Sequence, residues 1–119
     1  MAEKEQGLDR ARFVLLETIG RKTKNPHRVE LWFALHGKTI YLSHEGERTD
    51  WMKNIAKNPD VIAKIGSKQF KARAIIAGDE SESREIGKRA LYEKYYGKAS
   101  KETIDDWFEL STVIELTPN

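Results

Sequence analysis

The stretch Thr18-Ile19-Gly20-Arg21-Lys22-Thr23-Lys24-Asn25-Pro26-His27-Arg28 decides how this chain folds. An apolar run, residues 13–16, precedes it, and an alternating run follows it, with apolar side chains at Val29, Leu31, Phe33 and Leu35. Gly20 can adopt a positive φ angle, and Asn25-Pro26 is typical of a turn. We therefore predict two antiparallel strands joined by this turn, with one face of the second strand pointing inward.

The predicted turn carries an unusual density of basic side chains, at Arg21, Lys22, Lys24, His27 and Arg28. Two interpretations are open. A run of like charges is most often a solvated turn. Alternatively, backbone N–H groups of a glycine-containing turn and guanidinium groups converge on a phosphate. The turn is not a P-loop, because the G-x-x-x-x-G-K-[ST] spacing is absent and residues 20–23 match only its end.

Outward from this hairpin, the pattern predicts further short strands connected by turns and helices. Strands are expected over 12–19, 28–36, 39–43, 61–65, 69–77 and 112–117, with a tight hairpin at Gly37-Lys38. A short helix over 51–57 would be capped by Thr49 or Asp50 and stopped at Asn58-Pro59. The class is α+β, mainly β, with about six antiparallel strands and helical connections. Closure into a barrel would remove the unpaired edges of such a sheet.

Two more helices are expected between the fifth and sixth strands. The first runs from 82 to 96 and ends before Gly97, with Asp79 and Glu82 as a variant capping box. Its expected apolar stripe consists of Ile86, Ala90, Leu91 and Tyr95. Ser100 is expected to cap a second, short helix that runs through Trp107 and Phe108.

Length and composition indicate a single domain over 1–119, with the polar residues 1–8 disordered. The chain has 119 residues, 39% hydrophobic and 34% charged, and a net charge of +2. That charge is small for a dedicated nucleic-acid-binding protein. No cysteine is present, which excludes disulfides and thiolate metal sites. No apolar run is long enough to span a bilayer and the N-terminus has no signal-peptide core, so we expect a cytoplasmic protein with no membrane contact.

Other common chemistries find no support in the sequence. The three histidines, His27, His36 and His44, form no helical i, i+4 pair, so no metal site is expected. No G-x-S-x-G nucleophile elbow occurs. Aromatic residues lie on neighbouring predicted elements, at Trp32, Phe33, Tyr41, Trp51 and in a late cluster, Tyr92, Tyr95, Tyr96, Trp107 and Phe108. They form either core or a slot for a flat ring.

The organising stretch resembles the signature of the deazaflavin-dependent nitroreductase family. The resemblance rests on residues 15–23 with Pro26 and Arg28, and it continues through 37–46, 50–54 and 57–61. It implies a split β-barrel related to the FMN-binding pyridoxamine-phosphate-oxidase barrel. It also implies a coenzyme of the 8-hydroxy-5-deazaflavin type, with FMN as the alternative, and a homodimer.

The resemblance also implies which residues bind the coenzyme. Arg21, Lys22, Thr23 and Arg28 would hold its phosphate end. The strand after Arg28, with Val29, Leu31 and Phe33, would line the ring, together with Leu42, Ser43 and His44 from the next strand and Trp51 and Asn54 from the helix. A late tyrosine, Tyr95 or Tyr96, would lie near the substrate as the catalytic group.

Two features depart from the family pattern. One extra residue lies between Thr23 and Arg28, and Glu45 stands where relatives place a lysine. The expected activity is that of a small oxidoreductase that reduces a planar electrophile such as a quinone, an enone or a nitro compound. The alternative is a non-enzymatic barrel that binds flavin or nucleic acid.

Overall fold

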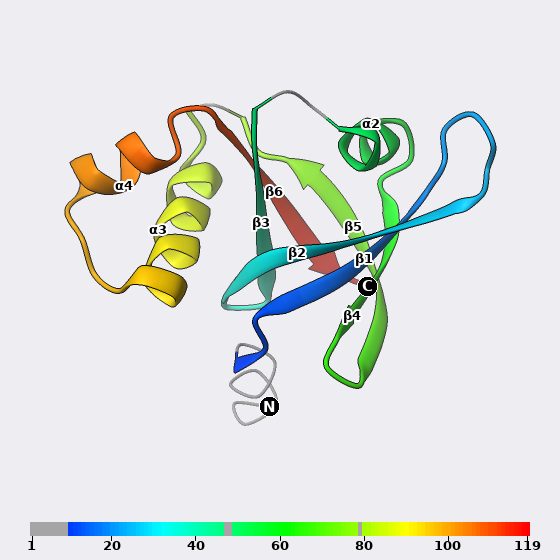
Figure 1. Ribbon diagram of the computed structural model, residues 1–119, viewed down its shortest axis with the longest axis horizontal. Helices are drawn as coiled ribbons and strands as arrows, with labels where there is room; N and C mark the ends of the chain where they lie inside the picture. Colours follow the sequence, from blue (N-terminus) through cyan, green and yellow to red (C-terminus); the bar gives the residue numbers. More distant parts are fainter. Residues whose placement is uncertain (1–9, 47–48, 79) are drawn as a thin grey trace.

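The computed structural model describes residues 10–46, 49–78 and 80–119, and its centre is a six-stranded antiparallel barrel (Figure 1). The strand order is β1-β2-β3-β6-β5-β4, and β4 pairs back onto β1 to close the barrel. The strands are β1 (Phe13–Ile19), β2 (Pro26–His36), β3 (Thr39–Glu45), β4 (Asp60–Ile65), β5 (Lys68–Ile76) and β6 (Ser111–Pro118). The prediction of a mainly β fold with six antiparallel strands is confirmed, and the barrel has no open edge.

The β1–β2 hairpin forms as the alternation predicts. Its register runs from Phe13 opposite Trp32 to Ile19 opposite Pro26. On β1, Val14, Leu16 and Thr18 point into the barrel and are fully buried. On β2, Phe33 is fully buried, while the apolar residues at positions 29, 31 and 35 are partly buried and pack against the same core. The neighbouring residues on both strands therefore face outward.

Helix α2 (Asp50–Lys57) closes one end of the barrel. It buries Trp51, Met52 and Ile55 in the barrel core, and full burial of such a side chain stabilises a fold by about 1.5–3 kcal/mol. The helix ends at Lys57, with Asn58 as its C-cap before the proline, as predicted. Thr49 occupies the N-cap position, but its side chain makes no capping hydrogen bond. The expected side-chain cap at this end is therefore wrong for Thr49.

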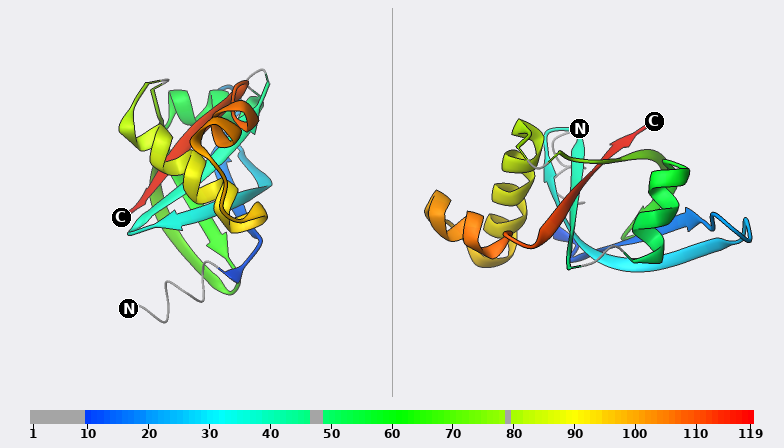
Figure 2. Two further views of the ribbon diagram at one scale, coloured as in Figure 1. Left: turned by 90° about the vertical axis from the view of Figure 1, so that its left-hand side faces the viewer. Right: turned by 90° about the horizontal axis from the view of Figure 1, so that it is seen from above.

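Helices α3 (Glu82–Tyr96) and α4 (Lys101–Trp107) cover the outside of the barrel on the opposite side (Figure 2). They form a second core with β2, β3 and β6, made of Ala34, Tyr41, Ala77, Leu91, Ile104, Phe108 and Val113. Gly87 lets α3 approach the sheet, because an added Cβ would lie 2.6 Å from Tyr41 Cδ1 and 2.8 Å from Val113 Cγ1. The two predicted helices are confirmed, including the α4 N-cap at Ser100.

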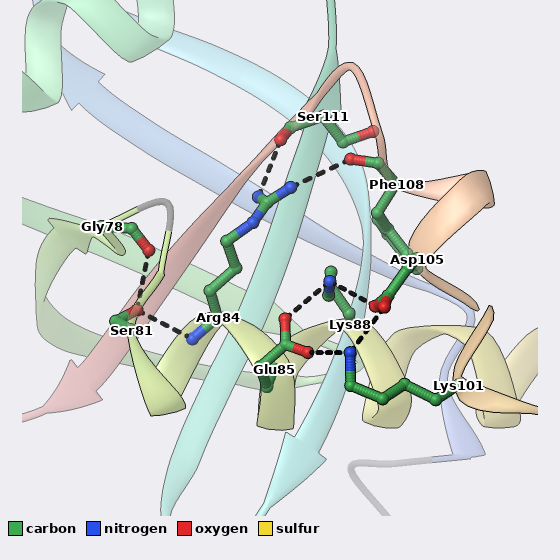
Figure 3. A network of polar contacts seen from close by, with 9 residues as sticks. All are labelled: Gly78, Ser81, Arg84, Glu85, Lys88, Lys101, Asp105, Phe108 and Ser111. Carbon is green, nitrogen blue, oxygen red and sulfur yellow. Dashed lines mark hydrogen bonds and ion pairs between the residues drawn. The ribbon is translucent and has the colours of Figure 1, made fainter.

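The predicted apolar stripe of α3 is partly wrong. The buried residues are Arg84, Gly87, Lys88 and Leu91, whereas Ile86, Ala90 and Tyr95 are only partly buried. Figure 3 shows why two cations can be buried here. Arg84 donates to the carbonyl oxygens of Ser111 (2.8 Å) and Phe108 (3.0 Å). These partners come from the α4–β6 connection, which the local sequence pattern of α3 does not reveal.

Lys88 lies between two carboxylates, 2.6 Å from Glu85 and 2.7 Å from Asp105. Lys101 contacts the same carboxylates, so four charged side chains join α3 to α4 (Figure 3). The lysines lower the pKa of Asp105 from its ordinary value of 3.8 to about 2. The pKa of Glu85 is also lowered, first by its hydrogen bond with Lys88.

Some predictions fall on residues that the structure does not describe. Asp79, the expected cap of α3, is one of them; the N-cap is Ser81, whose hydroxyl accepts from the N–H of Arg84 at 3.1 Å. The disorder predicted for 1–8 also lies outside the described residues. Among the helices that are described, none has the length and apolar character needed to cross a membrane.

Candidate functional site

The turn between β1 and β2 is tightly closed by its own backbone. Gly20 donates its N–H to the carbonyl of Asn25 (2.8 Å), and Lys24 donates to the carbonyl of Gly20 (2.9 Å). A Cβ added to Gly20 would lie 2.8 Å from His27 Nε2 and 2.9 Å from Thr23 Oγ1. A side chain here would have to displace both of these side-chain ends, and its Cβ would lie 3.0 Å from the carbonyl oxygen of Asn25. The absent side chain of Gly20 lets His27 and Thr23 approach the floor of the turn.

A buried amide connects this turn to helix α2. The Oδ1 atom of Asn54 accepts from the backbone N–H of Arg21 (3.2 Å) and from its Nη1 (3.0 Å). The Nδ2 atom of Asn54 donates to Thr18 Oγ1 (3.2 Å), and both Asn54 and Thr18 are essentially inaccessible to solvent. Because the amide uses its donor and its acceptor, its orientation is fixed, and so is the position of the Arg21 guanidinium.

The turn and the start of α2 together enclose a cleft of about 210 Å³. The cleft is lined by Gly20, Arg21, Lys22, Thr23, His27, Asp50 and Asn54. Two permanent cations, a hydroxyl and an imidazole thus surround one opening, and among the described residues Asp50 is the only carboxylate that lines it. This donor set is the one that proteins use for phosphate, and the glycine floor leaves room for its oxygens. The residues present fit the phosphate end of a coenzyme.

Arg28, the other basic residue assigned to the phosphate, does not line this cleft. It lies opposite Glu17 in the β1–β2 register, and its Nε donates to the Glu17 carboxylate at 2.9 Å. Both side chains are on the outer face of the barrel, and the Arg28 side chain is 64% exposed. The structure therefore brings Arg21, Lys22 and Thr23 together and places Arg28 on another surface.

The residues assigned to the ring differ widely in exposure. Phe33 and Leu42 are fully buried and Trp51 nearly so, since all three belong to the barrel core. Their side chains therefore have no free face for a ring. The partly buried residues of the set are Val29 and Leu31 on β2 and Ser43 and His44 on β3. The His44 ring meets Trp51 edge to face, with centroids 6.1 Å apart.

The two late tyrosines lie far from the cleft, because α3 and the β1–β2 turn are at opposite ends of the molecule (Figures 1 and 2). The Tyr95 hydroxyl is held by backbone groups of β2 and of the residue before β1. It accepts from the N–H of Phe33 (3.0 Å) and lies 2.8 Å from the Phe33 carbonyl oxygen and 2.7 Å from that of Arg12. Its ring stacks on Trp32 with a centroid distance of 4.2 Å.

Tyr96 is 49% exposed and packs against Trp107, 4.9 Å away between ring centroids, and against Tyr92 at 5.2 Å. Trp32 and Trp107 are also substantially exposed. These rings continue into Phe13, which is exposed and lies opposite Trp32 in the register. The late aromatic residues are thus divided. Phe108 is core, Tyr92 and Tyr95 are partly buried, and Tyr96 and Trp107 are exposed.

Sequence reasoning missed two contributors to the site: Asp50, which lines the cleft, and Thr18, which holds the amide of Asn54 beneath it. Asp50 was considered only as a helix cap, and Thr18 was given no role beyond its strand. The alternation with Leu16 places Thr18 inside, where its hydroxyl needs a buried partner. An inward-facing threonine three residues before Arg21 indicates that a buried polar partner lies beneath the turn. The identity of the partner, Asn54, depends on how α2 packs.

Comparison with known proteins adds a family and a set of similar folds. A family model described as F420H(2)-dependent quinone reductase matches residues 2–105. No curated protein matched the chain.

Solved structures match nearly the whole fold at low sequence identity. The conserved hypothetical protein Rv2991 of Mycobacterium tuberculosis has a TM-score of 0.82 and 21% identity, over 99% of this chain and 79% of that one. A reductase named FDR-A and described as F420-H2 dependent has a TM-score of 0.65 and 23% identity, over 88% and 93%. A Listeria innocua protein, provisionally named pyridoxamine 5′-phosphate oxidase, has a TM-score of 0.69 and 19% identity, over 99% and 92%. At these identities the structures show the fold.

Proposed function

The chain belongs to the F420H(2)-dependent quinone reductase family, and on that premise we propose that it reduces planar electrophiles such as quinones, enones or nitro compounds. The family confirms an oxidoreductase and a deazaflavin coenzyme, both of which the sequence resemblance implied. It names a quinone reductase, so a quinone is the first acceptor to test. A barrel with a cationic cleft at one end is consistent with an oxidoreductase that binds a coenzyme carrying phosphate.

The cleft of the β1–β2 turn is the observation that carries the proposal. Arg21 is positioned there by a buried amide, and Lys22 and Thr23 line the same opening. We assign the phosphate of the coenzyme to this cleft. A hydrogen bond to a charged group contributes about 1.5–3 kcal/mol, so Arg21 alone accounts for roughly tenfold to a hundredfold in affinity.

The coenzyme, when bound, supplies the hydride, and the protein anchors and orients it. From the phosphate cleft, the partly buried residues Val29 and Leu31 continue along β2, and Ser43 and His44 lie at the end of β3. We assign the ring to this side of the barrel. These side chains would exclude water from one ring face and fix its orientation, and no protein nucleophile is required.

We also propose that the protein acts as a homodimer. Within one chain the aromatic surface around Tyr96 is remote from the phosphate cleft, so the two cannot form one pocket. The surface exposes large apolar side chains at Phe13, Leu15, Trp32, Tyr96 and Trp107, which is typical of an interface. If a second copy packs on this surface through the side of its barrel to which we assign the ring, Tyr96 comes close to that copy's coenzyme. Sedimentation velocity that shows only a 13.7 kDa monomer at micromolar concentration would contradict the dimer.

The activity is tested by two measurements on the purified protein. The first is a fluorescence titration with the oxidised deazaflavin coenzyme, with FMN as the comparison. The second follows the oxidation of the reduced coenzyme with a soluble benzoquinone, an enone or a nitroaromatic compound as acceptor. We expect tighter binding of the deazaflavin than of FMN, and faster turnover with the quinone than with buffer alone. If the protein binds the coenzyme but reduces none of these acceptors, it is a non-enzymatic carrier of the coenzyme.

A further inference from the structure

The guanidinium of Arg21 is shared between two acceptors of very different character. Its Nη1 donates to Asn54 Oδ1 at 3.0 Å, and its Nη2 donates to Asp50 Oδ1 at 3.5 Å. Asn54 is buried and its amide is held on the other side by Thr18, so this contact cannot be exchanged without loss. The Asp50 side chain is 81% exposed, and 3.5 Å is at the limit of a hydrogen bond.

The two contacts therefore divide the arginine into a fixed edge and an exchangeable edge. The fixed edge positions the guanidinium toward the cleft. The exchangeable edge is occupied by a carboxylate that also lines the cleft. An exposed ion pair of this kind contributes only about 0.2–1 kcal/mol, and it is screened by salt.

We infer that Asp50 is an internal stand-in for the coenzyme phosphate: it occupies the outer N–H of Arg21 in the free protein and gives it up when the phosphate enters. This inference rests on the proposed binding of the coenzyme in this cleft. A phosphate that reaches Arg21 must replace the carboxylate or share the guanidinium with it. Asp50 thus lowers the affinity of the cleft for every anion.

The same loss of binding free energy lowers the occupancy of the cleft more for a weakly bound anion than for a tightly bound one. Inorganic phosphate binds through the cleft alone, so its affinity is low and any further loss of affinity leaves the cleft mostly unoccupied. The coenzyme gains additional binding from its ring and tail, so the same loss leaves it bound. Asp50 would keep the cleft free of small anions while admitting the coenzyme.

The test compares Asp50→Asn with the wild-type protein and with Asp106→Asn. The second variant makes the same change of charge at an exposed residue of α4, remote from the cleft. Dissociation constants are measured for the deazaflavin coenzyme by fluorescence, and for inorganic phosphate by the NMR shifts of the amides of residues 21–23. At low salt we expect Asp50→Asn to tighten both by about 1.5-fold to fivefold. The control should change neither, and high salt should abolish the gain.

A second background separates displacement from simple repulsion. In Arg21→Ala the carboxylate has no guanidinium to occupy, so adding Asp50→Asn should relieve only the charge repulsion and give a smaller gain than it gives when Arg21 is present. An equal gain in the two backgrounds would overturn the inference, because Asp50 would then act only by repelling the anion. Unchanged affinity of Asp50→Asn for both ligands would also overturn it.

The same experiment distinguishes this inference from the proposed function. If phosphate binding responds to Asp50 and Arg21 as expected but the coenzyme does not bind, the stand-in role is supported and the proposed function is wrong. If the coenzyme binds and Asp50→Asn has no effect on either ligand, only the stand-in role is wrong. A thermal melt of each variant checks that the start of α2 remains folded.

Discussion

Replacing Asn54 with alanine should damage both the stability of the barrel end and the coenzyme site. The change removes three hydrogen bonds: two from Arg21 and one to Thr18. The bond with the guanidinium is worth about 1.5–3 kcal/mol, and the two neutral bonds are worth about 0.5–1.5 kcal/mol each. Because water can enter the cleft and replace part of this, we expect a loss of about 2–4 kcal/mol in the free energy of unfolding.

The measurement is urea unfolding at equilibrium, with Lys53→Ala as the control. Lys53 is an exposed residue of the same helix, so its replacement should change the stability by less than about 0.5 kcal/mol. In the fluorescence titration, Asn54→Ala should also lower the affinity for the coenzyme by about tenfold, because Arg21 loses the contact that positions its guanidinium. If Asn54→Ala is as stable as the control and binds the coenzyme normally, the buried amide neither joins the turn to α2 nor positions Arg21.

Three further predictions follow from particular contacts. Arg28→Ala should lower the affinity for the coenzyme less than threefold, against tenfold or more for Arg21→Ala, because Arg28 faces outward and pairs with Glu17. A larger effect of Arg28→Ala than of Arg21→Ala would mean that the phosphate binds on the outer face. Glu45→Lys should strengthen deazaflavin binding more than FMN binding at low salt, because the deazaflavin tail is the longer and more anionic; no change in either titration would place Glu45 away from the tail. Acidification from about pH 5 toward pH 2 should loosen α4 from α3, which would be seen as a loss of near-ultraviolet circular dichroism. The pKa values of Asp105 and Glu85 are lowered in the folded protein, so the stability they contribute is present above their unfolded pKa values and is lost as the pH falls through the folded ones. If the signal of Asp105→Asn is as sensitive to acid as that of the wild type, this role is contradicted.

The sequence predicted the strands well because one face of each is buried and alternation then fixes which residues point inward. Val14, Leu16 and Phe33 lie in the core for this reason. The same alternation places Arg28 outward, since Val29 faces inward, and applied consistently it separates Arg28 from the cleft. The resemblance to the family grouped it with Arg21 because the grouping was made along the chain and not across the sheet.

Other features depended on contacts distant in the sequence. The buried face of α3 contains Arg84 and Lys88 because their partners lie on the α4–β6 segment. No local periodicity predicts that a cation will find a carbonyl or a carboxylate 17 or more residues away. The contacts of Asn54 were not predictable for the same reason: the resemblance names it as a coenzyme-binding residue, but its hydrogen-bond partners come from β1 and the turn.

The central claim is that the cleft formed by the β1–β2 turn and the start of α2 holds the phosphate of the deazaflavin coenzyme. A crystal structure of the complex tests it most directly. We predict phosphate oxygens within about 3.2 Å of the Arg21 guanidinium and of the Thr23 hydroxyl, with the Asn54 contact to Arg21 retained. A phosphate bound elsewhere, for example beside Arg28 on the outer face, with the cleft empty, would contradict it.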